Sequence, residues 1–577
     1  GPLEFGTAGL RGVMQAGLNG MNVYTVRHAT QAFANIIRNC GESIGDGVTI
    51  AHDCRNNSRA FACEAASVLM ANGIHVNLFE DLRPTPELSF AIRETGSIAG
   101  INITASHNTK EFNGYKAYWA DGAQMPPEHA EKVSREMARI DVFDDIQRID
   151  LEEAASGGLL TIIGAEMDEK YMSAVLAQSV GREFVAAAPD DFEIVFTPFH
   201  GAGYRLVPEV LHRIGMKHII PVPEQMVVDG NFPTVASPNP ENVEGFKMAI
   251  ALAKEKDSEL IIGTDPDADR CGVVVRNGEE YQALTGNQIG VLLLDYLISV
   301  RKAKGILPEN AAAVKSIVTT PMANRICEMN GVSIHEVFTG FKFIGEKIKE
   351  FLETGEYSFI FGFEESIGFL AGTYARDKDA VVASMLVAEM ACYYRNRNMN
   401  LVQALQALYE KYGFYREHTT SVQYEGFDAG EKMRARMDRI RKDVPTEIGL
   451  PVLRIRDSQK VRGAGPVRFP RLHWGQPVIP RPFLLSLLFV CRIVCRRSGA
   501  SAPGNTPLPA RKRSRWRPGH PSGEPLWPAD TFPDPRNREN GRSAFRWPNA
   551  KGRRSRLLHP TAQISGSGRA RRCFYRS

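Results

Sequence analysis

Apolar, strand-like runs alternate with helical stretches along most of the chain. In the first part the strand-like runs are VTIAHD (48–53), IHVNLF (74–79) and IAGINITA (98–105), separated by helical segments such as 58–73. The alternation recurs at 192–203 and 259–265, and again at 311–320, 332–338 and 357–363. Strands that alternate with helices predict βαβ units in parallel or mixed sheets. We therefore expect an α/β fold of three similar mixed domains around a central cleft.

The spacing of these units sets the expected domain limits. Units of roughly 100 to 140 residues match ordinary domain sizes. We predict a first domain over 1–160, a second over 161–280 and a third over 281–412. A helix-like stretch at 426–444 and a strand-like run at 452–457 would begin an incomplete fourth α+β domain, over 413–457.

The composition changes abruptly near Ser458. Residues 458–577 hold 25 Lys and Arg against 4 Asp and Glu, a net charge of +21, whereas the preceding part carries −17. They also hold 16 of the 34 prolines and four of the five tryptophans. Such a composition, without βα periodicity, predicts a disordered basic tail.

Three origins of the tail compete. A segment that binds nucleic acid would mix arginine with aromatic residues, as 516–528 and 551–558 together do. A membrane anchor is disfavoured because the apolar run at 482–495 is too short and contains Arg492. A shifted reading frame near Ser458 is favoured because the change falls inside an expected domain. We therefore do not expect the tail to bind nucleic acid, and the nucleotide sequence would decide.

Ser106 stands at the corner where a strand-like run becomes a polar turn, in INITASHNTKEFNGYK (101–116). A hydroxyl at such a corner is exposed for chemistry. His107 is adjacent, but adjacent side chains in an extended turn diverge, which makes it a poor base for Ser106. A serine that only caps the next segment is the alternative reading.

A second motif gathers three carboxylates in one loop. In SELIIGTDPDADRCGVVV (258–275), Asp265, Asp267 and Asp269 alternate between two strand-like runs and can converge on one hard cation. A calcium-binding EF-hand loop is excluded because its sixth and twelfth positions would be Arg270 and Arg276. Magnesium is the better candidate, with three solvated turn aspartates as the alternative. Cys271 beside the loop is a poor ligand for such an ion.

A third motif, FIFGFEESIGF (359–369), ends a hydrophobic strand in a paired-acid loop. Glu364 and Ser366 lie on one side of an extended backbone, where both can bond sugar hydroxyls.

Together the motifs resemble one enzyme family. FGTAGLRG (5–12), TASHNT (104–109), GTDPDADR (263–270), TGFKF (339–343) and GFEESIGF (362–369) are similar, in this order and spacing, to the α-D-phosphohexomutases, the phosphoglucomutase and phosphomannomutase superfamily. The resemblance covers residues 3 to about 457. Thr109 departs from the proline that the family often has there.

The resemblance implies a role for each matched residue. Ser106 would be the phosphoserine that exchanges phosphoryl groups with the sugar, and the three aspartates would hold Mg²⁺ with Ser106. Lys116 would be the general acid/base. Arg11 and His107 would stand beside it in the reaction centre. Residues expected to bind the substrate are Arg270, Thr339, Gly340, Lys342, Glu364, Ser366, Arg376 and Lys378.

Elementary chemistry supports the same assignment. A loose phosphoryl-transfer transition state is stabilised by positioning and positive charge, which a cation, Arg11, Arg270 and Lys116 would supply. Nearby cations are expected to lower the pKa of Lys116 and suit it to accept a proton from a sugar hydroxyl. A plain surface lysine is the alternative.

The resemblance also implies an activity and a location. We expect interconversion of hexose 1-phosphate and hexose 6-phosphate, with glucose favoured by EESIG and glucose 1,6-bisphosphate as activator. Phosphopentomutase, phosphomannomutase and an inactive sugar-phosphate-binding remnant are the alternatives. Nine scattered cysteines without CxxC pairs and no signal or membrane segment predict a cytoplasmic protein. The sequence does not indicate the oligomeric state.

Two features depart from the family. Its fourth domain carries a phosphate-binding loop of the type RPSGTEP, and GHPSGEP (519–525) shares letters with it but not its strand–loop–helix context. Residues 1–4 are read as a truncated beginning. Because of the aberrant C-terminal part we expect impaired turnover.

Overall fold

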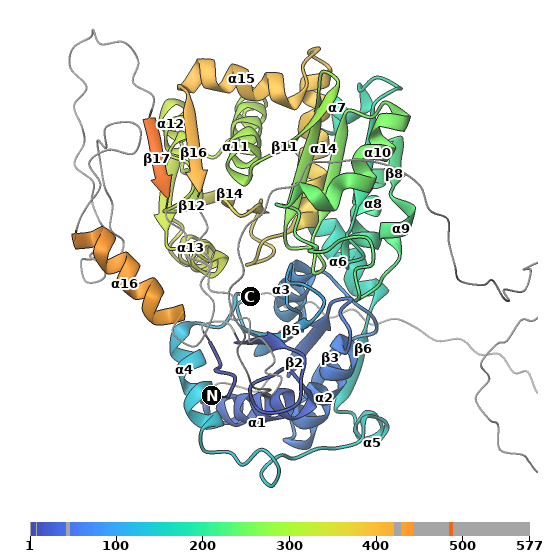
Figure 1. The fold of residues 1–577 in the computed structure, drawn as a ribbon, viewed down its shortest axis with the longest axis vertical. Helices are drawn as coiled ribbons and strands as arrows, with labels where there is room; N and C mark the ends of the chain where they lie inside the picture. Colours follow the sequence, from blue (N-terminus) through green and yellow to red (C-terminus); the bar gives the residue numbers. More distant parts are fainter. Residues whose placement is uncertain (1, 7–8, 42–46, 420–428, 443–483, 489–577) are drawn as a thin grey trace, which may run out of the picture. The chain divides into compact units, whose positions relative to one another are not determined.

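The computed structural model describes residues 2–6, 9–41, 47–419, 429–442 and 484–488. Most of them form three successive α/β domains, drawn from blue through green and yellow to light orange in Figure 1. The prediction of three mixed α/β domains is confirmed.

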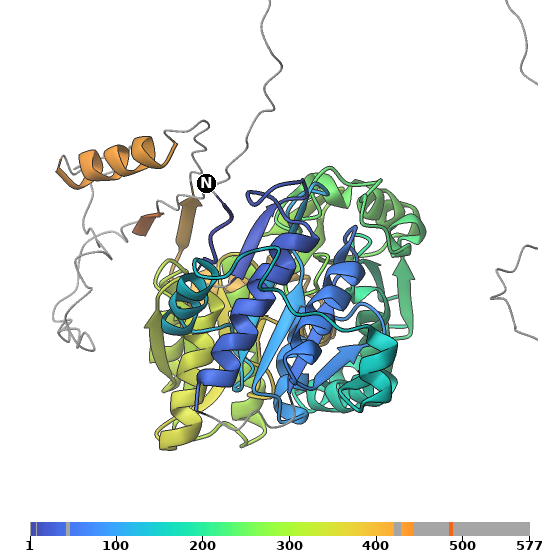
Figure 2. The ribbon, with the colours of Figure 1, turned by 90° about the horizontal axis from the view of Figure 1, so that it is seen from below.

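The first domain is a six-stranded mixed sheet with helices on both faces. Its strand order is β1-β5-β4-β2-β3-β6, and β5 runs antiparallel to both of its neighbours. Helices α1 and α2 cover one face (Figure 2) and α3 the other. The strands are β1 (Gly9–Val13), β2 (Val48–His52), β3 (Val76–Phe79), β4 (Ala99–Ile103), β5 (Phe112–Trp119) and β6 (Leu160–Ile163). The helices are α1 (Val23–Asn39), α2 (Ser58–Ala71), α3 (Thr85–Glu94), α4 (Pro127–Met137) and α5 (Leu151–Ser156).

The second domain has a five-stranded sheet in the order β11-β10-β9-β7-β8. Strands β9 and β10 form an antiparallel pair, so the aspartate motif is the loop of a hairpin. The strands are β7 (Glu193–Thr197), β8 (His218–Pro221), β9 (Leu260–Thr264), β10 (Cys271–Asn277) and β11 (Glu280–Leu284). The helices are α6 (Ala165–Leu176), α7 (Arg182–Ala186), α8 (Gly203–Arg213), α9 (Pro223–Met226), the 3-10 helix η1 (Val243–Phe246) and α10 (Lys247–Lys256).

The third domain has a four-stranded sheet in the order β13-β12-β14-β15, in which only β15 is antiparallel. The EES motif is the turn between β14 and β15. The strands are β12 (Ala311–Ser316), β13 (Ser333–Val337), β14 (Ser358–Glu364) and β15 (Gly368–Leu370). The helices are α11 (Gly286–Ala303), α12 (Met322–Asn330), α13 (Phe341–Thr354), α14 (Ala380–Arg395) and α15 (Leu401–Tyr412).

The second and third domains are packed through a common core. Helix α14 lies against α8, and buried side chains of both helices belong to one apolar cluster. The backbone is also joined: Arg270 forms a bridge with Gly368, and the Cys271 amide donates to the Ile367 carbonyl at 3.1 Å. The aspartate hairpin and the EES turn are therefore fixed side by side.

The predicted domain limits at 160 and 280 fall close to the ends of the first two sheets, at Ile163 and Leu284. Beyond α15 the structure describes β16 (Tyr415–Thr419), α16 (Ala429–Lys442) and β17 (Leu484–Leu488), with β16 and β17 paired in parallel. β17 belongs to the predicted tail. The rest of 458–577 and the strand-like run at 452–457 lie outside the described residues, so the tail's disorder stays a prediction.

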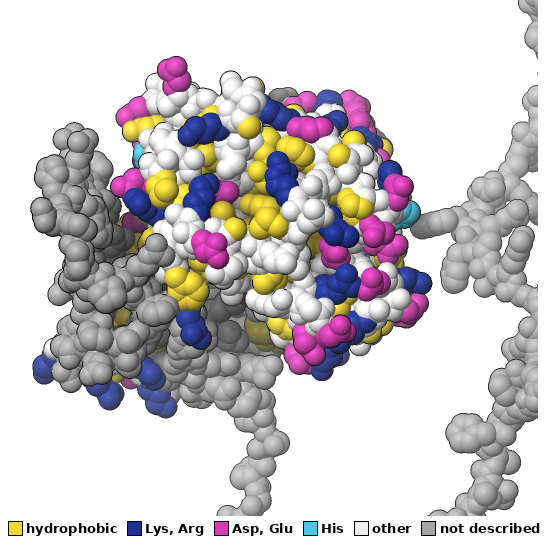
Figure 3. All heavy atoms as spheres, turned by 90° about the horizontal axis from the view of Figure 1, so that it is seen from above, with side chains coloured by type: hydrophobic (Ala, Val, Ile, Leu, Met, Phe, Trp, Pro, Cys, Tyr) yellow, Lys and Arg dark blue, Asp and Glu magenta, His cyan; other side chains and the backbone are white. Residues whose placement is uncertain are grey.

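The described surface carries mixed charge. On the face drawn in Figure 3, Lys and Arg side chains are interspersed with Asp and Glu side chains. Among the described residues no helix is long and apolar enough to cross a membrane. The six described cysteines are free thiols. A cytoplasmic location stays a prediction.

Gly9 of the FGTAGLRG motif is required by β1–β5 packing. Its φ is +121°, and a Cβ built there would lie 1.8 Å from the Tyr115 carbonyl oxygen. We expect Gly9→Ala to lower the free energy of unfolding by about 2 to 5 kcal/mol, from backbone strain plus the clash. Chemical denaturation measures the free energy of unfolding. Gly73→Ala is the control, because Gly73 also has a positive φ but open space around it. If both variants lose the same free energy of unfolding, the clash at Gly9 adds nothing to the backbone strain.

Candidate active site

Ser106 stands in a tight turn immediately after β4. Its backbone is left-handed, with φ +52°, and the Thr104 hydroxyl accepts a hydrogen bond from its amide at 2.8 Å. The turn presents Ser106 Oγ to the second domain, where it donates to Asp265 Oδ2 at 3.0 Å. The serine of the first motif and the acids of the second therefore meet, although 159 positions separate them in the chain.

Two expectations about this turn are wrong. His107 does not diverge from Ser106, because the left-handed bend at Ser106 brings His107 Nδ1 to 3.1 Å from Oγ. Ser106 is also not exposed, since its surroundings leave it 3% accessible. The Ser106 side chain is therefore largely shielded from solvent in the structure.

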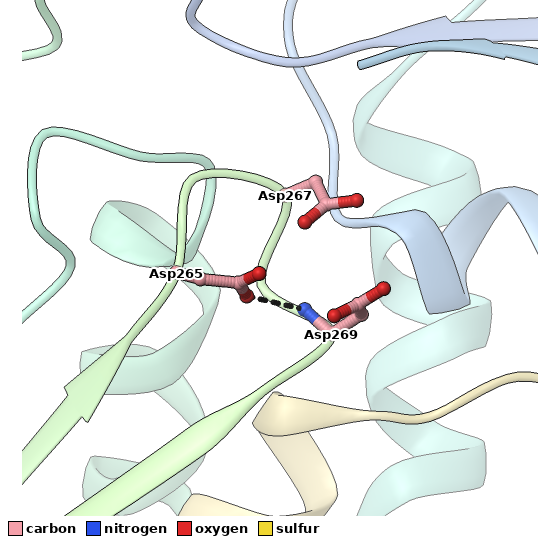
Figure 4. Close-up of side chains that lie close together, drawn as sticks. All are labelled: Asp265, Asp267 and Asp269. Carbon is pink, nitrogen blue, oxygen red and sulfur yellow. Dashed lines mark hydrogen bonds between the residues drawn. The ribbon is translucent and has the colours of Figure 1, made fainter. Parts of the chain in front are cut away.

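The three aspartates form one buried cluster at the β9–β10 turn (Figure 4). Asp265 Oδ1 accepts from the amides of Asp269 at 3.1 Å and Arg270 at 3.0 Å, which closes the loop on itself. One carboxylate oxygen from each aspartate lies within 4.8 Å of the others. The convergence predicted from their alternation is thus present in the geometry.

Two elements of the first domain, α3 and β5, donate hydrogen bonds to Asp267. Thr85, at the start of α3, donates from its hydroxyl to Asp267 Oδ2 at 2.7 Å, and its amide donates to the Asp267 carbonyl at 2.8 Å. Lys116 of β5 reaches the same Oδ2 at 2.7 Å and Asp269 Oδ2 at 3.3 Å. These contacts fix the aspartate loop against the Ser106 domain.

The electrostatics of the cluster follow from burial and mutual proximity. Burial and the carboxylates of Asp269 and Asp267 raise the pKa of Asp265 well above its usual range. Burial also raises the pKa of Asp267, but the Lys116 ammonium outweighs it and holds that pKa below its usual value. The raised pKa of Asp265 shows that a further negative charge is unfavourable in this cluster.

The expectation of a lowered pKa for Lys116 is wrong in this arrangement. Burial lowers the pKa of Lys116, but Asp267 and Asp269 raise it by more, and the net shift is upward. Neighbouring cations alone would lower this pKa, but the Lys116 ammonium lies between two aspartates. Lys116 is accordingly a charged ammonium, and its raised pKa means that it holds this proton more tightly than a free lysine does.

Lys378 brings the third domain to the same cluster. Its Nζ lies 3.1 Å from Asp269 Oδ2 and 3.1 Å from Asp377 Oδ1. Asp377 in turn accepts from Tyr118 Oη at 2.9 Å and Gln124 Nε2 at 3.0 Å, both in the first domain. Burial lowers the pKa of Lys378, and Asp269 and Asp377 raise it by more. All three domains therefore contribute charged groups to one centre.

The predicted sugar loops are joined by Glu364. Its Oε1 accepts from the Gly340 amide at 2.7 Å, which ties the 339–343 loop to the EES turn, and burial raises its pKa. Ser366 is half-buried in that turn, and Thr339 is exposed. Lys342 Nζ lies 5.2 Å from the centre of the Phe343 ring, and burial lowers its pKa.

Three predicted arginines occupy different places. Arg11 is exposed and donates to Asn108 Oδ1 in the Ser106 turn at 3.2 Å. Arg270 Nε is 3.8 Å from Asp269 Oδ1. Arg376 is buried and donates to the carbonyls of Thr373 and Ala375, so its described contacts are not with the aspartates.

The pairing of β1 with β5 explains how two of the cations share one face. Arg11 lies opposite Gly114, and Lys116 lies opposite Gly9. Directly opposed residues share a face, as do residues two apart, so the two long side chains are diagonal neighbours with a glycine facing each.

Sequence reasoning missed Arg55, Thr85 and Asp377. Arg55 stands in the loop after β2, which is parallel to β4, and its guanidinium contacts the Ser106 turn. Loops at the carboxyl ends of parallel strands lie at the same edge of a sheet. The position of Arg55 directly after the strand-like run at 48–53 could therefore have indicated that it lies near Ser106. Thr85 and Asp377 had no local signal, since their importance comes from contacts across domains.

The cluster fits a divalent cation. Asp267 Oδ1 and Asp269 Oδ1 are buried oxygens without a hydrogen-bond partner in the described structure. Buried carboxylate oxygens left in this way are costly unless a cation satisfies them. Three convergent hard oxygen donors are the ligands that Mg²⁺ prefers.

Comparison with known proteins agrees with this geometry. Three family models match in succession, described as Phosphoglucomutase/phosphomannomutase, alpha/beta/alpha domain I, domain II and domain III, over residues 2–143, 169–278 and 285–412. The chain belongs to the phosphoglucomutase/phosphomannomutase family. The resemblance inferred from the five motifs is confirmed, and membership supports phosphohexomutase activity in general terms.

Curated family members cover most of the chain. A phosphoglucomutase of Staphylococcus haemolyticus is 33% identical over 464 residues, which are 80% of this chain and 82% of the relative. One of Staphylococcus epidermidis is 36% identical over 463 residues, or 79% and 82% of the two chains.

Solved structures share the fold. A phosphoglucomutase/phosphomannomutase family protein from Burkholderia thailandensis aligns with a TM-score of 0.55 at 20% identity, over 70% of this chain and 79% of that one. The Paramecium parafusin, a phosphoglucomutase crystallised in an open form, aligns with a TM-score of 0.57 at 18% identity, over 76% and 80%.

Proposed function

We propose that this protein is a phosphoserine-dependent sugar mutase, with Ser106 as the carrier of the phosphoryl group. The observation that carries the proposal is the 3.0 Å hydrogen bond from Ser106 Oγ to Asp265, within a three-aspartate cluster that Lys116 also contacts. A serine, a cation site and a charged lysine in one buried centre are the parts that phosphoryl transfer requires.

Asp265, Asp267 and Asp269 would hold Mg²⁺ beside the Ser106 oxygen. When bound, the ion offsets negative charge on the transferred phosphoryl group. The low accessibility of Ser106 excludes water, which protects a phosphoserine from hydrolysis between turnovers.

Protons are exchanged by the residues around Ser106. When a sugar bisphosphate donates its phosphoryl group, the Oγ–P bond forms and the bond from phosphorus to the sugar oxygen breaks. The Ser106 hydroxyl donates to Asp265 Oδ2 in the structure and would turn to His107 Nδ1, 3.1 Å away, to which it gives its proton. Lys116 gives a proton to the sugar oxygen. The second half-reaction reverses both transfers at the other sugar oxygen, so no net proton is consumed.

The third domain would hold the sugar. Glu364 and Ser366 offer oxygens for sugar hydroxyls, while Lys342 and Lys378 offer positive charge. We propose glucose 1-phosphate and glucose 6-phosphate as substrates, because the EESIG loop is closer to glucose-type loops. Turnover of glucose, mannose and pentose phosphates in parallel coupled assays tests this. A preference for mannose or pentose phosphates would favour the phosphomannomutase or phosphopentomutase alternative.

The whole chain is expected to turn over poorly. A fourth-domain clamp normally orients the sugar by binding its non-reacting phosphate, and the sequence from Ser458 onward shows no such loop. Two lost charge-assisted hydrogen bonds of about 1.5 to 3 kcal/mol each correspond to roughly 10²- to 10⁴-fold in rate. A coupled mutase assay, with and without glucose 1,6-bisphosphate, should give slow turnover beside a staphylococcal phosphoglucomutase. Equal rates would overturn the account of the C-terminal part.

A further inference from the structure

One buried arginine holds the backbone of the Ser106 turn from inside the first domain. Arg55 is 3% exposed, and its guanidinium donates to four carbonyl oxygens of the segment 106–112. Nη1 reaches Thr109 at 2.9 Å and Phe112 at 3.1 Å, and Nη2 donates to Ser106 and Asn108. These carbonyl dipoles converge on one point, where they would repel one another without the cation.

Arg55 is itself fixed by the loop that carries it. Its Nε lies 3.2 Å from Asp53 Oδ2, and both side chains of this ion pair are fully shielded from solvent. Asp53 Oδ1 accepts from the Arg55 amide at 2.9 Å and from the Ser58 hydroxyl at 2.7 Å. These contacts fix the orientation of the guanidinium independently of its bonds to the Ser106 turn.

The second domain also contacts Arg55 and the loop that carries it. The Phe232 ring lies over the guanidinium, with its centre 5.1 Å from the central carbon. A Cβ on Gly230 would lie 2.4 Å from the Asn56 amide nitrogen, so the two loops touch with no room for a side chain. Asn56 Nδ2 also donates to Asn231 Oδ1 at 2.9 Å.

We infer that Arg55 is a positioning residue for phosphoryl transfer at Ser106 and that the 229–232 loop of the second domain holds it in place. The inference rests on the proposed function of Ser106. The left-handed backbone of Ser106 is unfavourable for a residue with a Cβ, and the four bonds to Arg55 maintain it. Without them Oγ would move away from Asp265, and displacement of a reacting group by about 1 Å costs roughly 100-fold in rate.

Arg55→Lys is the informative substitution, because it keeps the charge but replaces the planar fork of five donors by a point charge. Single-turnover phosphorylation of Ser106 by glucose 1,6-bisphosphate, with saturating Mg²⁺, gives a maximal rate and a half-saturating concentration. We expect the maximal rate to fall about 10- to 100-fold and the half-saturating concentration to stay unchanged. Arg59→Lys is the matched control, since Arg59 also donates to a backbone carbonyl, that of Phe79 at 2.7 Å, but away from the Ser106 turn.

A second variant and a second measurement distinguish a displaced Ser106 turn from a general folding defect. Phe232→Leu keeps an apolar side chain but removes the aromatic face, and should lower the maximal rate in the same direction by a smaller factor. Amide hydrogen exchange should rise at 104–112 in both variants and stay unchanged elsewhere in the first domain. Unchanged rate and exchange in both variants, with a wild type that is phosphorylated, would overturn the role of Arg55 alone. A wild type that takes up no phosphate would overturn the proposed function itself.

Discussion

Ser106→Ala is expected to abolish phosphate uptake from glucose 1,6-bisphosphate and to lower mutase turnover by about 10⁴- to 10⁶-fold, the range seen when a nucleophile is removed. The reason is that Oγ is the atom that both accepts and returns the phosphoryl group. Neither Asp265 nor His107 has a hydroxyl that could form a stable phosphate ester in its place. Incorporated phosphate is measured by intact mass, and turnover by a coupled assay.

The matched control for this prediction is Ser173→Ala. Ser173 is an exposed serine on α6, outside the described site, and its loss should leave both quantities at the wild-type level. Phosphate uptake that persists in Ser106→Ala would show that another residue is the carrier, and the aspartate cluster would then need a different interpretation.

Asp267→Asn is expected to weaken Mg²⁺ binding by about 100-fold or more and to slow Ser106 phosphorylation with it. Asp267 supplies an oxygen without a hydrogen-bond partner in the described structure, and its second oxygen holds Lys116 and Thr85. The amide keeps the shape but loses the charge that attracts the ion. Isothermal titration calorimetry with Mg²⁺ measures the affinity, and mass spectrometry over time measures the phosphorylation rate.

Asp190→Asn serves as the control for the loss of one negative charge. Asp190 pairs with Lys217 at the surface, where both side chains are exposed, so its neutralisation should change neither quantity. If Asp267→Asn retains wild-type affinity and rate, the loop has a purely structural role. If affinity falls while the phosphorylation rate does not, the ion is bound but is not used in the transfer.

Much of the fold could be predicted because the chain alternates clearly between strand-like and helical segments. The runs at 48–53, 98–105 and 259–265 became β2, β4 and β9, and each places a polar loop at its carboxyl end. The position of β5 could not be predicted, since it lies between β1 and β4 and runs antiparallel to both. Strand order depends on pairings between distant segments, which a local pattern does not contain.

The candidate site shows the same division. Ser106 and the aspartates were recognisable because their motifs are local, and the structure brings them together. The orientation of His107 was mispredicted because it depends on a left-handed backbone at Ser106, and the pKa direction of Lys116 because its partners are 151 and 153 positions away. Arg55 donates to backbone carbonyls of the Ser106 turn. Every residue has such a carbonyl, so the side chains of the turn do not indicate this contact.

The most direct test of the central claim is to locate phosphate on the protein after incubation with glucose 1,6-bisphosphate and Mg²⁺. Intact mass followed by peptide mapping gives both the amount and the position. The account predicts one phosphate per chain, on the peptide that contains Ser106, and its removal when glucose 1-phosphate or glucose 6-phosphate is added. Phosphate on any other residue, or a chain that binds Mg²⁺ but takes up no phosphate, would contradict it.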